Sequence, residues 1–168
     1  MEKTDFVSYV HDLHFEGATI FAPGNRAFAR LGIRANAFLF NTEKGLGYLK
    51  AIVKYHVAPN ATLYTDAFYD KTGTDEEKMM SHQHFEVKTL LKGASVGVDI
   101  GKWGIFSRMK VNGFAGVPVD DVPAKNAVIH VVDRVLIPPH RHGHAEEQVQ
   151  EDEEMSVDEL KERLADYL

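Results

Sequence analysis

The sequence predicts an α+β fold in one globular domain, and two observations support that prediction. Apolar residues recur every three or four positions in the first third of the chain, whereas residues 62–137 form short alternating segments divided by glycine and asparagine. The chain has 168 residues, 44% of them hydrophobic and none cysteine, so its core must supply the stability without disulfides. Helices followed by a sheet-rich half are typical of the α+β class.

The first elements are two short helices and the strand between them. Residues 6–13 have near-helical apolar spacing and predict the first helix. The apolar run 18–22 predicts a strand that Pro23 stops, because proline cannot donate to a β-ladder. Residues 25–31 then predict a helix that ends at Gly32, a residue suited to the left-handed conformation after a helix.

A longer amphipathic helix follows. Asn41 and Thr42 offer an N-cap, and an apolar stripe that includes Leu49, Ile52 and His56 ends near Pro59. We expect this helix to pack on the sheet.

Beyond Pro59 the apolar period changes to two, which predicts strands. The predicted strands cover residues 62–68, 85–91, 95–100, 105–111, 117–122 and 128–137. Residues 70–83 are polar and predict a loop or a single helical turn. The last strand is almost continuously apolar, which is typical of a central strand covered on both faces.

The composition changes after Pro139, and we divide the chain there. Residues 1–139 form the predicted domain, and residues 140–155 contain histidines and then acidic residues that predict a solvated linker. Residues 156–168 predict an amphipathic helix, with Ser156 and Glu159 at the spacing of a capping box. Because the linker is solvated, we expect this helix to be separable from the fold.

Charge and hydropathy exclude two kinds of partner. The net charge is −6, and residues 145–168 carry −8 of it, which leaves +2 for residues 1–144. No basic block with interleaved aromatic residues is present, so nucleic acid is not an expected partner. No apolar run is long enough to predict a transmembrane segment, and the first residues lack the apolar region of a secretory signal.

Three segments resemble the signatures of fasciclin-like domains. Residues 19–28, Thr-Ile-Phe-Ala-Pro-Gly-Asn-Arg-Ala-Phe, resemble the first signature, a strand that turns into a helix. Tyr55-His56-Val57 stands where the family has its Tyr-His pair, and residues 126–139 resemble the second signature, with Ala127 where glycine is usual. The resemblance covers residues 19–139, and fungal members with long acidic tails are similar.

The resemblance implies a fasciclin-like wedge, a β-sandwich-like pair of sheets with several helices packed around it. It implies an extracellular, cell-surface or cell-wall adhesion module without catalysis or cofactor, whose secretion signal belongs to a removed upstream portion. The implied partners are a protein or polysaccharide at the cell surface, or a second copy of the domain. The motif residues expected to serve packing are Thr19, Phe21, Pro23, Phe28, Asn126, His130 and Asp133.

Tyr55, His56 and Val57 form the predicted contact site, because the resemblance associates this region with adhesion. Tyrosine and histidine combine an apolar body with a polar tip, which suits a contact surface. The alternative is that His56 is buried and donates to a backbone carbonyl, which would hold the helix end against the sheet. His130 interrupts a central strand and is expected to have a fixed hydrogen-bond partner, because an unpaired polar group there would cost about 1 to 3 kcal/mol.

Histidine clusters supply two alternative functions. His140, His142 and His144, with His82 and His84, could bind zinc or copper, although alternating histidines on a flexible segment are not preorganised. A hydrolase would need His56 or His130 as a base with Asp133 as its orienting partner, but no nucleophile motif accompanies them. We therefore predict no metal and no catalysis.

Asn60-Ala61-Thr62 is a candidate N-glycosylation sequon. It lies just after the long helix, in a predicted exposed turn. It favours a secreted protein independently of the resemblance.

Overall fold

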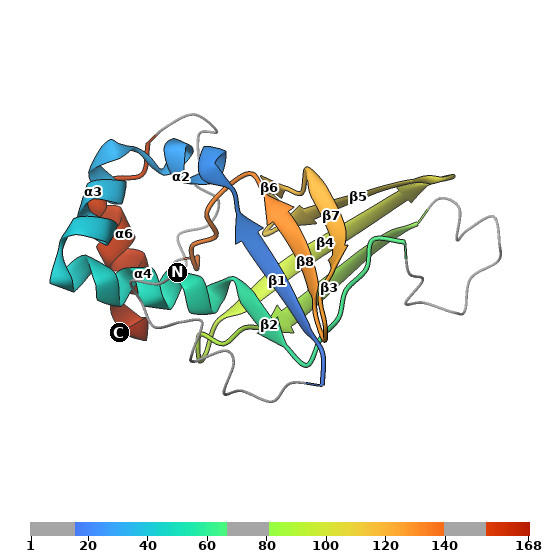
Figure 1. Ribbon diagram of the computed structural model, residues 1–168. Coiled ribbons are helices and arrows are strands. Elements are labelled where there is room, and N and C mark those ends of the chain that lie inside the picture. The colour runs from blue at the N-terminus through green and yellow to red at the C-terminus, as the bar shows by residue number, and fades with distance from the viewer. Residues whose placement is uncertain (1–15, 67–80, 140–153) are drawn as a thin grey trace.

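Two four-stranded sheets and a layer of helices at one end of them make up the structure, a computed structural model that describes residues 16–66, 81–139 and 154–168 (Figure 1). Buried apolar side chains from both sheets and from the helices form one core cluster. This arrangement confirms the predicted α+β fold class. Among the described residues, no helix has the length and apolar character needed to cross a membrane.

The first sheet contains the two signature strands side by side. Its strands, in spatial order, are β2 (Val57–Pro59), β1 (Ala18–Pro23), β8 (Val128–Val132) and β7 (Val119–Pro123). Strands β1 and β8 are parallel, with Phe21 opposite His130, while both outer pairs are antiparallel. The prediction of a central strand beginning at residue 128 is confirmed, although the strand ends at Val132 rather than at residue 137.

The second sheet is fully antiparallel and has the longest strands. Its order is β3 (His82–Lys88), β4 (Ser95–Trp103), β5 (Phe106–Val111) and β6 (Ala115–Gly116). Along β4, Val96, Val98 and Ile100 are fully buried, as a period of two requires when one face covers the core. Figure 1 shows β4 and β5 running together away from the helices.

The helices follow β1 directly. They are α2 (Asn25–Leu31), α3 (Ile33–Asn41) and α4 (Glu43–Tyr55). The predicted cap of α4 is confirmed, because the Thr42 hydroxyl accepts a hydrogen bond from the Gly45 amide at 2.9 Å. Helix α3 was not predicted: Gly32, with φ of 93°, ends α2 as expected but also starts the next helix.

The predicted strand over residues 62–68 is wrong for the part that the structure describes. Residues 61–66 form no ladder, because side chains satisfy their backbone: the Leu63 amide donates to the Thr19 hydroxyl at 3.0 Å, and the Thr65 amide donates to the Asp121 carboxylate at 3.0 Å. The predicted first helix, most of the polar loop and most of the linker lie outside the described residues.

The C-terminal helix is part of the fold, so the expectation that it is separable is wrong. Helix α6 (Val157–Leu164), which the short 3₁₀ helix η2 (Ala165–Tyr167) follows, packs against α3 and α4. Leu160 and Leu164 are completely buried in the common core, and the cap predicted at Ser156 is present, with the Glu159 amide at 3.1 Å from its hydroxyl. The apolar stripe of α6 covers surfaces of α3 and α4 that the β-strands do not reach. The stabilisation from this apolar burial keeps α6 on the domain, although the sequence before it is polar.

We expect Leu160→Ala to lower the unfolding free energy by about 3 kcal/mol, because it leaves a cavity in the core. For a chain of this size that loss corresponds to a fall in Tm of about 6 to 12 °C, measurable by circular dichroism. Leu168→Ala is the matched control, since Leu168 is 62% exposed. A Tm unchanged by Leu160→Ala, or by deletion of residues 154–168, would show that α6 is not part of the core.

Candidate functional site

The end of helix α4 is buried, which corrects the predicted contact surface. Tyr55, His56 and Val57 all lie inside the protein, so none of their side chains is available to a partner. The His56 Nδ1–H donates to the Ile52 carbonyl at 2.8 Å, and Nε2 accepts from the Leu136 amide at 2.9 Å. The alternative interpretation of His56, a buried ring that holds the helix end, is therefore the one that the structure supports.

The Tyr55 side chain contacts the second sheet. Its hydroxyl donates to the Ser95 carbonyl at 2.9 Å and accepts from the Asn112 side-chain amide at 3.1 Å. Burial raises the pKa of Tyr55 to about 12, and burial lowers the pKa of His56 to about 4. Both side chains are therefore neutral at physiological pH and serve as fixed hydrogen-bonding groups.

His130 is also a structural residue, and the expected fixed partner is confirmed. Its Nε2–H donates to the Leu63 carbonyl at 2.8 Å, while Nδ1 accepts from the Asp121 amide at 3.2 Å. Its ring stacks on Phe21 with 5.9 Å between the ring centroids. The hydrogen bonds described for both buried histidines go to backbone groups, which leaves the hydrolase hypothesis without a hydroxyl partner among them.

The other motif residues hold loops and strand ends in place. The Thr19 hydroxyl donates to the Ala61 carbonyl at 2.8 Å, and Asp133 accepts from the Gly116 amide at 2.8 Å. Phe28 packs against Phe40 with 5.7 Å between the ring centroids. The two remaining motif positions are Pro23, the last residue of β1, and Asn126, exposed in the turn before β8.

Asn60 is exposed in the turn after β2, with a left-handed φ of 56°. Its backbone amide donates to the Gly17 carbonyl at 2.8 Å. Its glycosylation stays a prediction.

The histidine clusters do not form a metal centre in the described part of the chain. His82 and His84 lie on the exposed face of β3, and His84 Nδ1 is 2.7 Å from the Asp99 carboxylate on β4. Within residues 16–66, 81–139 and 154–168, no group of three His, Cys, Asp or Glu side chains could hold a metal ion. His140, His142 and His144 lie outside the described residues.

The tip of the β4–β5 hairpin is the most apolar exposed part of the second sheet. Trp103 is 54% exposed, Ile105 93% and Phe106 71%. Trp103 pairs with Phe106 across a two-residue turn, in which Gly104 has the positive φ of 62° that suits the first position of a type II′ turn. The prediction placed Ile105 in a strand, whereas it stands at the turn itself.

The Trp103 indole lies beside Gly101, in space that a larger residue at position 101 would occupy. A Cβ atom on Gly101 would lie 2.8 Å from the indole Cη2, so only glycine leaves room for the ring to lie against β4. Arg108, the strand partner of Gly101, is exposed on β5. The hairpin therefore presents an aromatic and aliphatic end next to a positive charge.

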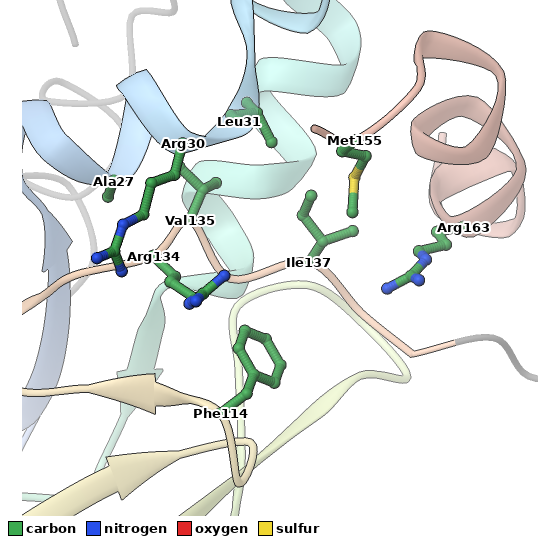
Figure 2. Close-up of a pocket in the computed structure, with 9 residues that line it drawn as sticks. All are labelled: Ala27, Arg30, Leu31, Phe114, Arg134, Val135, Ile137, Met155 and Arg163. Carbon is green, nitrogen blue, oxygen red and sulfur yellow. The ribbon is translucent and has the colours of Figure 1, made fainter. Parts of the chain in front are cut away.

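A second candidate site is a small pocket where the helices meet the segment after β8 (Figure 2). Its volume is about 70 Å³. The residues that line it are Ala27, Arg30, Leu31, Phe114, Arg134, Val135, Ile137, Met155 and Arg163. Sequence reasoning did not find it, because the arginines come from distant parts of the chain.

Comparisons with known proteins agree with the geometry. A family model described as the fasciclin domain matches residues 1–138. The chain is 33% identical over 159 residues to the aurofusarin biosynthesis cluster protein S of Gibberella zeae, covering 83% of this chain and 38% of that protein. It is 32% identical over 123 residues to stabilin-1 of Mus musculus, covering 72% of this chain and 4% of that protein. The chain therefore spans less than half of either relative.

A solved structure shares the fold. It is a FAS1 domain pair from the insect cell adhesion molecule fasciclin I, with a TM-score of 0.53 and 19% sequence identity. The match covers 77% of this chain and 39% of that one.

Burial of His56 predicts a loss of stability in acid. Its pKa is about 4 in the folded state and 6.5 in the unfolded chain, so between these values the unfolded state binds the additional proton. We expect the unfolding free energy to fall by up to about 3 kcal/mol as the pH drops through this window, measured by urea denaturation. His56→Gln should flatten this dependence, whereas His82→Gln, which alters an exposed ring, should leave it intact. An equally steep dependence in His56→Gln would assign the effect to other groups.

Proposed function

The chain belongs to the fasciclin domain family, and from this premise we propose that it is an extracellular or cell-surface adhesion module that binds a protein partner through the tip of its β4–β5 hairpin. The observation that carries the proposal is the exposure of Trp103, Ile105 and Phe106 at one protruding turn. The insect protein that shares the fold is a cell adhesion molecule, which supports the general role.

The chemistry of the hairpin tip suits a protein contact. Aromatic residues and arginine dominate the binding energy of protein interfaces, and Trp103, Phe106 and Arg108 supply both kinds here. The indole already packs beside Gly101, which limits the rotamer freedom that it would lose on binding. Three apolar side chains are a small contact, and we propose that useful strength comes from several linked copies.

The proposal includes no catalytic step. His56 and His130 use both ring nitrogens to bind backbone groups, and both rings are buried. A base must reach a reacting group, and neither ring is placed to do so. A cell-wall polysaccharide is the competing partner, because a sugar could stack on the exposed indole.

Multivalent display tests the proposal. We expect beads coated with the domain to adhere to protein-bearing cell surfaces, and Trp103→Ala with Phe106→Ser to reduce adhesion by at least about tenfold, because each such contact is worth about 2 kcal/mol. Ile33→Ser is the matched control, since Ile33 is 82% exposed but belongs to α3.

The folding of each variant is first checked by circular dichroism. Adhesion equal to the parent in the folded double variant would refute the hairpin as the contact. Adhesion that survives protease treatment of the cells but is inhibited by soluble polysaccharide would assign the partner to carbohydrate instead.

A further inference from the structure

The pocket in Figure 2 joins three parts of the chain that are far apart in sequence. Arg30 belongs to α2, Arg134 follows β8, and Arg163 belongs to α6. Figure 2 shows Arg134 and Arg163 directed toward the region of Ile137 from opposite sides, with Phe114 below. All these residues line the same pocket.

The lining combines positive charge with apolar surface. Among the described residues that line it, three are arginines, six are apolar and none is acidic. Asp133 contacts Arg30 at 3.4 Å and Glu159 pairs with Arg163, but neither carboxylate lines the pocket. The described part of the wall that a ligand would meet therefore combines arginine side chains with apolar surface.

Arg163 has an unused donor at this place. Its Nε is buried without a hydrogen-bond acceptor among the described residues, while its Nη2 contacts Glu159. A buried donor without an acceptor is costly, and a hydrogen bond from the Arg163 Nε–H to a carboxylate would be strengthened by the charges of both groups. An acceptor entering the pocket would remove that cost.

From these observations we propose that the pocket binds a small organic carboxylate with an apolar body. The carboxylate meets the arginines, and the apolar body lies against Phe114, Ile137 and Met155. The volume of about 70 Å³ has room for the carboxylate and part of its attached group, while Phe114, partly exposed, extends the apolar surface at the mouth. This site lies on other elements than the hairpin tip, so it is independent of the adhesion proposal.

Occupation of the pocket would also strengthen the docking of α6. Met155 and Arg163 come from the C-terminal segment, whereas Arg30 and Arg134 come from the body of the domain. A ligand held by both sides binds the docked state better, and it therefore shifts the equilibrium toward it. Hydrogen exchange of the α6 amides would report this effect.

The test uses the full chain and a pair of matched probes. Benzoate carries the carboxylate, and benzamide is a neutral molecule of nearly the same shape. By calorimetry, we expect saturable one-to-one binding of benzoate and binding of benzamide that is at least about tenfold weaker, because hydrogen bonds to a charged group are lost. We also expect slower exchange of the α6 amides with benzoate than with benzamide.

Two variants and one control assign the site. Arg163→Met should weaken benzoate binding at least about tenfold, and Lys161→Met, which removes a positive charge from the same helix outside the pocket, should change it less than about twofold. Arg30→Met repeats the test on α2 if Arg163→Met loosens the helix. Equal binding of benzoate and benzamide, no saturable benzoate binding, or wild-type affinity in both folded arginine variants would overturn the proposal.

Discussion

The fold depends on the hydrogen bonds made at the end of α4, where two neighbouring polar side chains reach in different directions. Tyr55 bonds to Ser95 at the start of β4, while His56 bonds to the Leu136 amide in the segment after β8. The backbone continues the connection, because the His56 carbonyl accepts from Phe21 on β1 at 2.9 Å. One helix end therefore joins both sheets, and its burial requires that each of these polar groups be paired.

The position of the helix layer follows from this connection between the end of α4 and the two sheets. Because α4 is fixed at its C-terminal end, its remaining length projects beyond the sheets (Figure 1). Its apolar side, which includes Tyr48 and Leu49, must therefore be covered by other helices. Helix α3 covers part of that side, and α6 covers a further part with Leu160 and Leu164. The C-terminal helix thus completes a core that the signature segments alone leave open.

Local patterns predicted the elements, whereas long-range pairing decided the sites. The Thr42 cap and the apolar run from residue 128 depend on near neighbours, and the structure confirms both. The sequence pattern did not predict helix α3, because it indicates Gly32 only as the end of a helix, whereas Gly32 ends α2 and also begins α3. The buried position of Tyr55 depends on Ser95, forty residues away in sequence, and no local period contains that information. No local pattern could predict the arginine pocket either, since its charges come from three parts of the chain that are far apart in sequence.

If the hairpin tip is the contact that we propose, Tyr55 supports it from inside the protein. Tyr55 contacts Ser95 at the beginning of β4 and Asn112 just after β5, and the Asn112 side chain accepts from the Gly97 amide at 3.0 Å. These contacts fix the base of the hairpin whose opposite end carries Trp103. A contact surface on a protruding hairpin is useful only if its base is rigid, because each loose side chain or strand must be ordered when a partner binds. Substitution of Tyr55 would therefore weaken adhesion by loosening the hairpin rather than by removing a contact, and its effect on adhesion should follow its effect on hairpin order.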